Sequence, residues 1–122
     1  MTQHTISGED LVRRYYELVD NRDVDNLVVL FGTEAVYHRP GYDPLRGRDQ
    51  LKRFYLEQRV IREGKHTLDA VIVSGPQVAV QGSFHGVLRD GKIVDARFAD
   101  FFTVSRDGTF SRRDTFFFAP LI

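Results

Sequence analysis

The chain has 122 residues, a length that suits one domain with a buried core, and its 17 basic and 17 acidic side chains balance. This balance gives the chain no general attraction to nucleic acid or to an anionic membrane surface. The absence of cysteine excludes a disulfide framework and a thiolate metal site.

No stretch approaches the ~20 consecutive apolar residues that a membrane helix needs. Residues 1–7 contain no signal-peptide pattern, and a chain without cysteine suits a reducing cytoplasm. We therefore expect a single domain over residues 1–122, located in the cytoplasm and not bound to a membrane.

The first half of the chain has the pattern of amphipathic helices. Ser7 is placed to cap a first helix, with Asp10 three residues later, and apolar side chains then recur at helical spacing. A second, short helix should follow Arg22 and Asp23, and a third should follow Gly47. Between them we expect a short strand over residues 34–39 and a loop over residues 40–44. The side chains expected to face inward are Leu11, Val12, Tyr15, Leu18, Val19, Val24, Leu27, Leu30, Phe31, Leu51, Phe54, Tyr55 and Val60.

The second half predicts an antiparallel sheet. Strands are expected over residues 66–74, 77–88, 92–105 and 109–118. Asp90-Gly91 and Asp107-Gly108 separate alternating runs and are typical of tight hairpins. Helices followed by a long antiparallel meander indicate an α+β fold, with the helices packed on one face of a curved sheet.

Asp100 interrupts an apolar face of the third of these strands. Alternate residues of a strand share one face, and here that face is otherwise apolar, since it carries Val94, Ala96, Phe98, Phe102 and Val104. A carboxyl group in such a wall must pair, accept hydrogen bonds or keep its proton. If it keeps its proton, it can donate a hydrogen bond to a ligand oxygen. The alternative is a structural salt bridge across the final hairpin, to Arg97, Arg112 or Arg113.

The order of elements resembles the nuclear transport factor 2 (NTF2)-like superfamily, the cone-shaped fold of ketosteroid isomerase and the SnoaL-type cyclases. The resemblance covers nearly the whole chain. It implies an apolar cavity between helices and sheet, and often dimerisation through the outer sheet face. The residues that carry it are Val12-Arg13-Arg14-Tyr15, Leu30-Phe31, Ala35-Val36 before Pro40, Leu45-Arg46-Gly47, Phe54-Tyr55, and the hairpin from Asp100-Phe101-Phe102 through Asp107-Gly108.

The resemblance to ketosteroid isomerase implies catalytic roles for three positions. Tyr15 matches that enzyme's oxyanion-hole tyrosine, and Asp100 matches its protonated aspartate, the example from which the neutral-acid argument above is taken. Arg39 stands where the isomerase has its catalytic base. An arginine cannot abstract a proton from carbon at neutral pH, so plain ketosteroid isomerase activity is not expected. The alternative for Tyr15 is a core ring with its hydroxyl at the surface.

A second resemblance, to the dehydratases and dehydrochlorinases of the same superfamily, implies a different pair. These enzymes use an aspartate late in the first helix and a histidine at the start of a strand, positions that Asp20 and His66 approach. Such a carboxylate orients the imidazole and makes it a competent base. The alternative is an ordinary helix-end aspartate and an exposed strand-start histidine.

Two further arrangements that the resemblance implies depend on strand parity. Arg39 and His38 are adjacent and point to opposite faces; the resemblance places Arg39 toward the cavity, and reversed parity would make His38 the base candidate instead. An epoxide-hydrolase arrangement of Arg97, Asp100 and Asp114 would need a bulge, because residues three apart face opposite ways.

The four histidines include no close-spaced pair and there is no glycine-rich phosphate loop, so we expect neither a metal nor a cofactor.

The C-terminal segment from Phe116 to Ile122 is apolar on both faces. This favours a homodimer, although a strand covered within one subunit would have the same pattern. We expect a protein that binds a small apolar molecule carrying an oxygen function. If it is an enzyme, we expect isomerisation, dehydration or cyclisation; the alternative is a non-catalytic ligand carrier or a dimeric interaction module.

Overall fold

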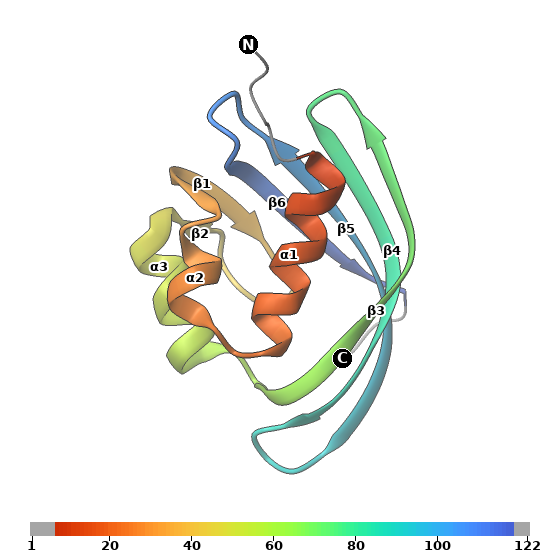
Figure 1. Ribbon diagram of the computed structural model, residues 1–122. Helices are drawn as coiled ribbons and strands as arrows, with labels where there is room; N and C mark the ends of the chain where they lie inside the picture. The colour runs from red at the N-terminus through yellow and green to blue at the C-terminus, as the bar shows by residue number, and fades with distance from the viewer. Residues whose placement is uncertain (1–6, 119–122) are drawn as a thin grey trace.

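The computed structural model describes residues 7–118, in which helices pack on one face of a curved, open sheet (Figure 1). The helices are α1 (Gly8–Asp20), α2 (Val24–Val28) and α3 (Gly47–Arg53), and a π-helical turn, η1 (Phe54–Gln58), continues α3. The strands are β1 (Phe31–His38), β2 (Leu45–Arg46), β3 (Ile61–Ser74), β4 (Gln77–Leu88), β5 (Ile93–Val104) and β6 (Phe110–Phe117). The predicted α+β architecture with its cone-like arrangement is confirmed.

Helix α1 has the N-terminus that its sequence predicts. The Ser7 hydroxyl accepts a hydrogen bond from the Asp10 backbone N–H at 3.1 Å, which satisfies one of the free donors of the first turn. Six apolar or aromatic side chains on the inner face of the helix are buried against the sheet. This burial, more than helix propensity, fixes the helix in place.

The sheet is mixed rather than wholly antiparallel. Its strand order is β2-β1-β6-β5-β4-β3, and β1 runs parallel to β6, while the other neighbours are antiparallel. A parallel neighbour cannot be joined by a hairpin, and here most of the chain separates the two strands. The local hairpin signals therefore predicted β3 to β6 but gave no information on how β1 would dock.

The predicted boundaries shift in three places. Strand β3 begins at Ile61, five residues before the predicted start, so Val60 is an exposed linker residue and not part of a helix. Phe31 is buried as predicted, but in β1. The two-residue strand β2 was not predicted.

The two predicted tight turns are present. Gly91 and Gly108 adopt φ values of 88° and 83°, a left-handed conformation that glycine reaches without strain. They connect β4 to β5 and β5 to β6.

The apolar C-terminal segment is exposed on its outer side. Phe116 and Phe118 are exposed, and residues 119–122 lie outside the described part of the chain. Across residues 7–118, no helix is long and apolar enough to cross a membrane.

Candidate functional site

A cavity of about 30 Å³ lies between the helices and the inner face of the sheet. We call it the inner cavity. Its wall combines apolar rings with hydroxyls, guanidinium groups, an imidazole and a carboxylate. The lining residues are Tyr15, Tyr37, Arg39, Tyr55, Arg59, Ile61, His66, Phe84, Phe98, Asp100, Arg113, Thr115 and Phe117.

Asp100 is fully buried on the inner face, as the strand parity predicted. Its carboxylate accepts hydrogen bonds from Tyr16, from Thr115 and, at 2.8 Å, from the Nη2 atom of Arg113. Both oxygens therefore already have protein partners, one of them a guanidinium group. A protonated Asp100 that donates to a ligand does not fit this geometry; the alternative of an arginine pair across the final hairpin does.

Arg113 connects this carboxylate to two tyrosines. The guanidinium is buried, and its Nη1 atom donates to the Tyr15 hydroxyl and, at 3.2 Å, to the Tyr55 hydroxyl. Asp100 and its neighbours hold the pKa of Arg113 well above its usual value, although burial acts in the opposite direction. A permanent charge thus lies at the centre of the site, neutralised by Asp100.

The Tyr15 and Tyr55 hydroxyls are hydrogen-bonded to each other. Each hydroxyl oxygen accepts a hydrogen bond from Arg113. The two hydroxyl groups carry two protons in total, and one of these forms the hydrogen bond between them. Among the described residues, the second proton has no acceptor. Burial raises the pKa of both hydroxyls, so they stay protonated at neutral pH. One O–H group is therefore free to donate to a ligand oxygen in the inner cavity.

Tyr16 contributes to the site through its contact with Asp100. Tyr15 lines the inner cavity whereas Tyr16 does not, although both rings are buried. The Tyr16 hydroxyl contacts Asp100 directly, whereas Tyr15, the tyrosine that the resemblance implies for the oxyanion hole, is linked to Asp100 through Arg113.

His66 and Asp20 lie in direct contact. The His66 Nδ1 atom is 2.6 Å from the Asp20 Oδ1 atom, and the His66 backbone N–H donates to Asp20 Oδ2 at 2.9 Å. Asp20 ends α1 and His66 lies within β3, so the contact joins the helix layer to the sheet. The carboxylate fixes the proton of a neutral His66 on Nδ1, which leaves Nε2 as the basic nitrogen.

The surroundings of His66 favour its neutral form. Burial lowers the pKa of His66 below its usual value, and the hydrogen bond that the ring donates to Asp20 only partly offsets that effect. An imidazole that is neutral at physiological pH can accept a proton. Packing holds the ring in place, since its centroid is 4.8 Å from that of Phe84 and 5.0 Å from that of Tyr16.

Arg39 faces the inner cavity and His38 faces away from it. The Nη1 atom of Arg39 donates to the Tyr37 hydroxyl at 3.2 Å, and its guanidinium lies over the ring of Phe117. Burial raises the pKa of Tyr37, but the charges of Arg113 and Arg39 outweigh this, and the net pKa lies below the usual tyrosine value. His38 is 2.9 Å from Asp114.

The epoxide-hydrolase arrangement is not assembled. Asp114 stands opposite Phe101 in the register of β5 and β6, whereas Asp100 stands opposite Thr115. Asp114 and Arg97 are thus on the outer face, and the guanidinium of Arg97 lies over the ring of Phe118. The expectation that strand parity would place Arg97 and Asp100 on opposite faces is confirmed.

Among the members of the site that sequence reasoning missed, two contribute most to its chemistry. Tyr55 was assigned only to a helix core, and Arg113 only to a possible salt bridge. Arg113 had a detectable signal, because residues 113 and 115 share the strand parity that faces Asp100 across the hairpin. Tyr55 lies on η1, and no feature of the sequence predicts the π-helical turn that carries it.

Comparison with known proteins identifies the class. A family model of the SnoaL-like domain matches residues 12–113. The chain therefore belongs to the SnoaL-like domain family, and its fold is that of the NTF2-like superfamily, which includes the ketosteroid isomerase-like proteins.

Solved structures from this superfamily are similar over most of the chain. SalBIII, described as an epoxide hydrolase/cyclase-like enzyme in pyran ring formation in the polyether salinomycin, has a TM-score of 0.79 at 21% identity, covering 89% of this chain and 88% of that one. An NTF2-like protein of unknown function from Burkholderia pseudomallei K96243 has a TM-score of 0.80 at 19% identity, covering 89% and 88%. A second one, from Exiguobacterium sp. 255-15, has a TM-score of 0.78 at 21% identity, covering 90% and 99%. At these identities the similarity establishes the fold.

Proposed function

We propose that this protein catalyses a cofactor-independent proton transfer on a small, largely apolar substrate that carries an oxygen function. The observation that carries the proposal is the Asp20–His66 contact at 2.6 Å, beside a cavity that also contains a tyrosine O–H group with no acceptor among residues 7–118. A base and an oxygen-stabilising donor in one dry site are the two parts that isomerisation, dehydration and cyclisation share.

In this proposal His66 removes a proton from carbon through Nε2. The positive charge that develops on the imidazole is stabilised by Asp20 at Nδ1. The Tyr15 and Tyr55 pair donates to the substrate oxygen as negative charge develops there. Arg113 polarises these hydroxyls, and Asp100 positions Arg113; Asp100 is then a positioning residue and not a proton donor.

The inner cavity must open for this chemistry. At about 30 Å³ it offers room on the scale of a single water molecule. Tyr55, Arg59 and Ile61 line both this cavity and a larger one of about 390 Å³ toward the surface. A shift of the long Arg59 side chain would join the two spaces and admit the reacting end of a substrate.

A non-catalytic ligand carrier is the second candidate. The observation that favours it is the Asp100–Arg113 pair, because a carboxylate held by an arginine positions other groups and does not offer a proton to a substrate oxygen. SalBIII, an epoxide hydrolase/cyclase-like enzyme, has a similar fold. This similarity supports catalysis only in so far as it shows that a protein of this fold can be an enzyme.

The test is hydrogen–deuterium exchange at carbon, followed by NMR in D₂O with a panel of cyclic enones and β-hydroxy ketones. We expect the wild-type protein to accelerate exchange at the carbon next to the carbonyl. His66→Asn should lower that rate by about 10²- to 10⁴-fold, the usual contribution of a general base, and Asp20→Asn should lower it less.

His85→Asn is the matched control. His85 also contacts a carboxylate, with its Nδ1 atom 2.5 Å from Asp95 Oδ1, but this pair is exposed. Its replacement should leave exchange unchanged. Binding of panel members without accelerated exchange, in wild type and His66→Asn alike, would establish the carrier and exclude the enzyme.

A further inference from the structure

The larger cavity near the C-terminal end of α1 has an unusual distribution of charge. We call it the outer cavity; its volume of about 390 Å³ lies within the range of ligand pockets, which starts at ~300 Å³. Four arginines line it and no acidic residue does. The complete lining is Val19, Arg22, Val24, Leu27, Tyr55, Leu56, Arg59, Ile61, Arg62 and Arg89.

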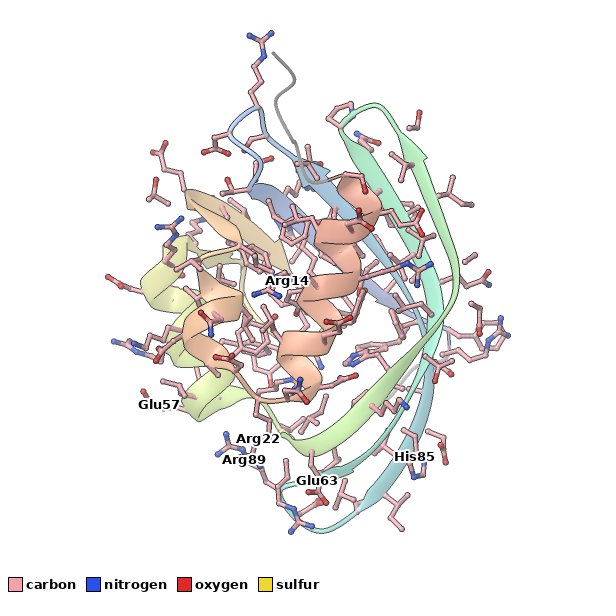
Figure 2. All side chains as sticks on the ribbon, viewed as in Figure 1. Arg14, Arg22, Glu57, Glu63, His85 and Arg89 are labelled. Carbon is pink, nitrogen blue, oxygen red and sulfur yellow. The ribbon has the colours of Figure 1, made fainter. Side chains whose placement is uncertain are left out.

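The four arginines are arranged in depth. Arg22, Arg62 and Arg89 are exposed and form the rim, whereas Arg59 is half-buried and lies deeper, with its guanidinium over the ring of Tyr55. Figure 2 shows Arg22 and Arg89 at the same end of the molecule, beyond the last turn of α1. Guanidinium groups from three separate segments of the chain thus converge on one concave surface.

These charges lack carboxylate partners among the described residues. Within residues 7–118, none of the four arginines forms a salt bridge. Asp20 and Asp23 are engaged elsewhere, with His66 and with the N-terminus of α2, and Glu57 and Glu63, which lie at the same end of the molecule (Figure 2), do not line the outer cavity. Burial lowers the pKa of Arg59, which is the effect of desolvation without a compensating carboxylate.

Two of the arginines are also held in position. Arg22 has a φ of 60°, a left-handed conformation that is strained for a residue with a side chain and that usually selects glycine after a helix. Arg89 donates through Nε to the Arg59 carbonyl at 2.7 Å and through Nη2 to the Leu56 carbonyl at 3.2 Å. A cation after a helix C-terminus has a structural benefit of its own, so Arg22 alone indicates no ligand; the convergence of all four arginines does.

We propose that the outer cavity binds the anionic head group of the substrate, a carboxylate or a phosphate, while the apolar body of the same molecule extends past Tyr55 and Ile61 toward the inner cavity. The planar guanidinium fork matches both oxyanions. The apolar walls, which include Val19, Leu27 and Ile61, suit the chain or ring next to the head group. The inference rests on the proposed function in one respect, namely that a single ligand occupies both cavities.

The test uses three probes with the same ten-carbon chain: decanoate, decyl phosphate and 1-decanol. By isothermal titration calorimetry, wild type should bind at least one of the two anions at least ~10-fold more tightly than the alcohol, since charge-assisted hydrogen bonds exceed neutral ones by about that factor. The preferred anion assigns the head group. The double variant Arg22→Gln/Arg62→Gln leaves the carbonyl contacts of Arg89 intact. It should lose most of the preference for the anion over the alcohol.

The control is Arg14→Gln/Arg106→Gln. It removes the same charge from two exposed arginines that do not line the outer cavity (Arg14 is labelled in Figure 2). This variant should retain the preference. Equal affinity of wild type for the alcohol and both anions would overturn the proposal, and so would an equal loss in both double variants.

The anion-binding proposal and the catalytic proposal can fail independently of each other. His66→Asn should retain the preference for the anion, because His66 does not line the outer cavity. If anion binding depends on Arg22 and Arg62 while His66→Asn leaves carbon exchange unchanged, the binding site is confirmed and the catalytic proposal fails. If His66→Asn abolishes exchange but the anions bind no better than the alcohol, the catalytic proposal stands and the anion site is wrong.

Discussion

Asp20 and Asp100 are two carboxylates at one site, and their partners give them different chemistry. Asp100 is held by Arg113, a group that keeps its proton at any physiological pH. Asp20 is held by His66, whose pKa is lowered by burial, so that the ring is neutral at physiological pH and can accept a proton. At the residue scale, therefore, only the Asp20–His66 pair is suited to move a proton, and the Asp100–Arg113 pair is suited to hold other groups in place.

The lowered pKa of His66 predicts a specific dependence of stability on pH. Burial disfavours the charged ring in the folded protein, whereas in the unfolded chain the histidine titrates near ~6.5. As the pH falls below that value, the unfolded chain binds more protons than the folded one, so the free energy of unfolding decreases, by at most about 1.4 kcal/mol per pH unit for one group. Between about pH 7 and about pH 5, the free energy of unfolding of His66→Gln should therefore decrease less steeply than that of the wild type.

Urea denaturation at several pH values measures this difference. His38 and His85 remain in both proteins, so the comparison isolates His66. Identical slopes for wild type and variant would show that His66 is not desolvated in the folded state.

At the scale of elements, the β3–β4 pair is shaped around one aromatic ring. Gly64 and Gly86 stand opposite each other, as do His66 and Phe84. A Cβ atom on Gly64 would lie 2.3 Å from the Phe84 Cζ atom, and one on Gly86 would lie 2.5 Å from it. The two glycines thus leave space for the Phe84 ring, which packs on His66.

We predict that Gly64→Ala destabilises the protein by about 1–3 kcal/mol, because the added methyl group overpacks this contact. Adding Phe84→Leu, which shortens the side chain, should recover part of the loss, so that the double variant is less unstable than the sum of the single changes. Thermal and urea unfolding measure both, with Lys65→Ala, an exposed neighbour on β3, as the control. Strict additivity of the two changes would show that the glycine and the ring do not compete for space.

At the scale of the whole molecule, the helices cover one face of the sheet and leave the other open (Figure 1). On that open face Ala79 stands opposite both Ile72 and Phe101, and Ala99 stands opposite Phe116. Phe101 and Phe116 are 49% and 54% exposed, and their rings lie edge to face with centroids 5.7 Å apart. Contiguous exposed aromatic surface of this kind is typical of an interface.

We propose that two copies associate through this face, in agreement with the sequence-based expectation of a homodimer. Sedimentation velocity should show a dimer for wild type and a shift toward monomer for Phe101→Asp, because a carboxylate would be buried without a partner. Ile93→Asp, on the same face but near the far end of β5, should have a smaller effect. A monomeric wild type at tens of micromolar would exclude this interface.

The sequence alone determined the features that depend on local pattern. Alternation in β5 placed Asp100 on the buried face, and the Asp-Gly pairs located both hairpin turns. The capping of α1 by Ser7 was equally predictable. Each of these depends on residues within a few positions of one another, so the physics that decides them is visible in the sequence.

Only the tertiary structure decided which partners meet across long separations. Three arginines were candidates for Asp100, and the register of β6 selected Arg113, which also brought Tyr15 and Tyr55 to the same guanidinium. The parallel docking of β1 on β6 and the early start of β3 likewise depend on packing between distant segments. A shift of one residue in such a register exchanges the two faces of a strand, and local patterns do not encode that choice across the whole sheet.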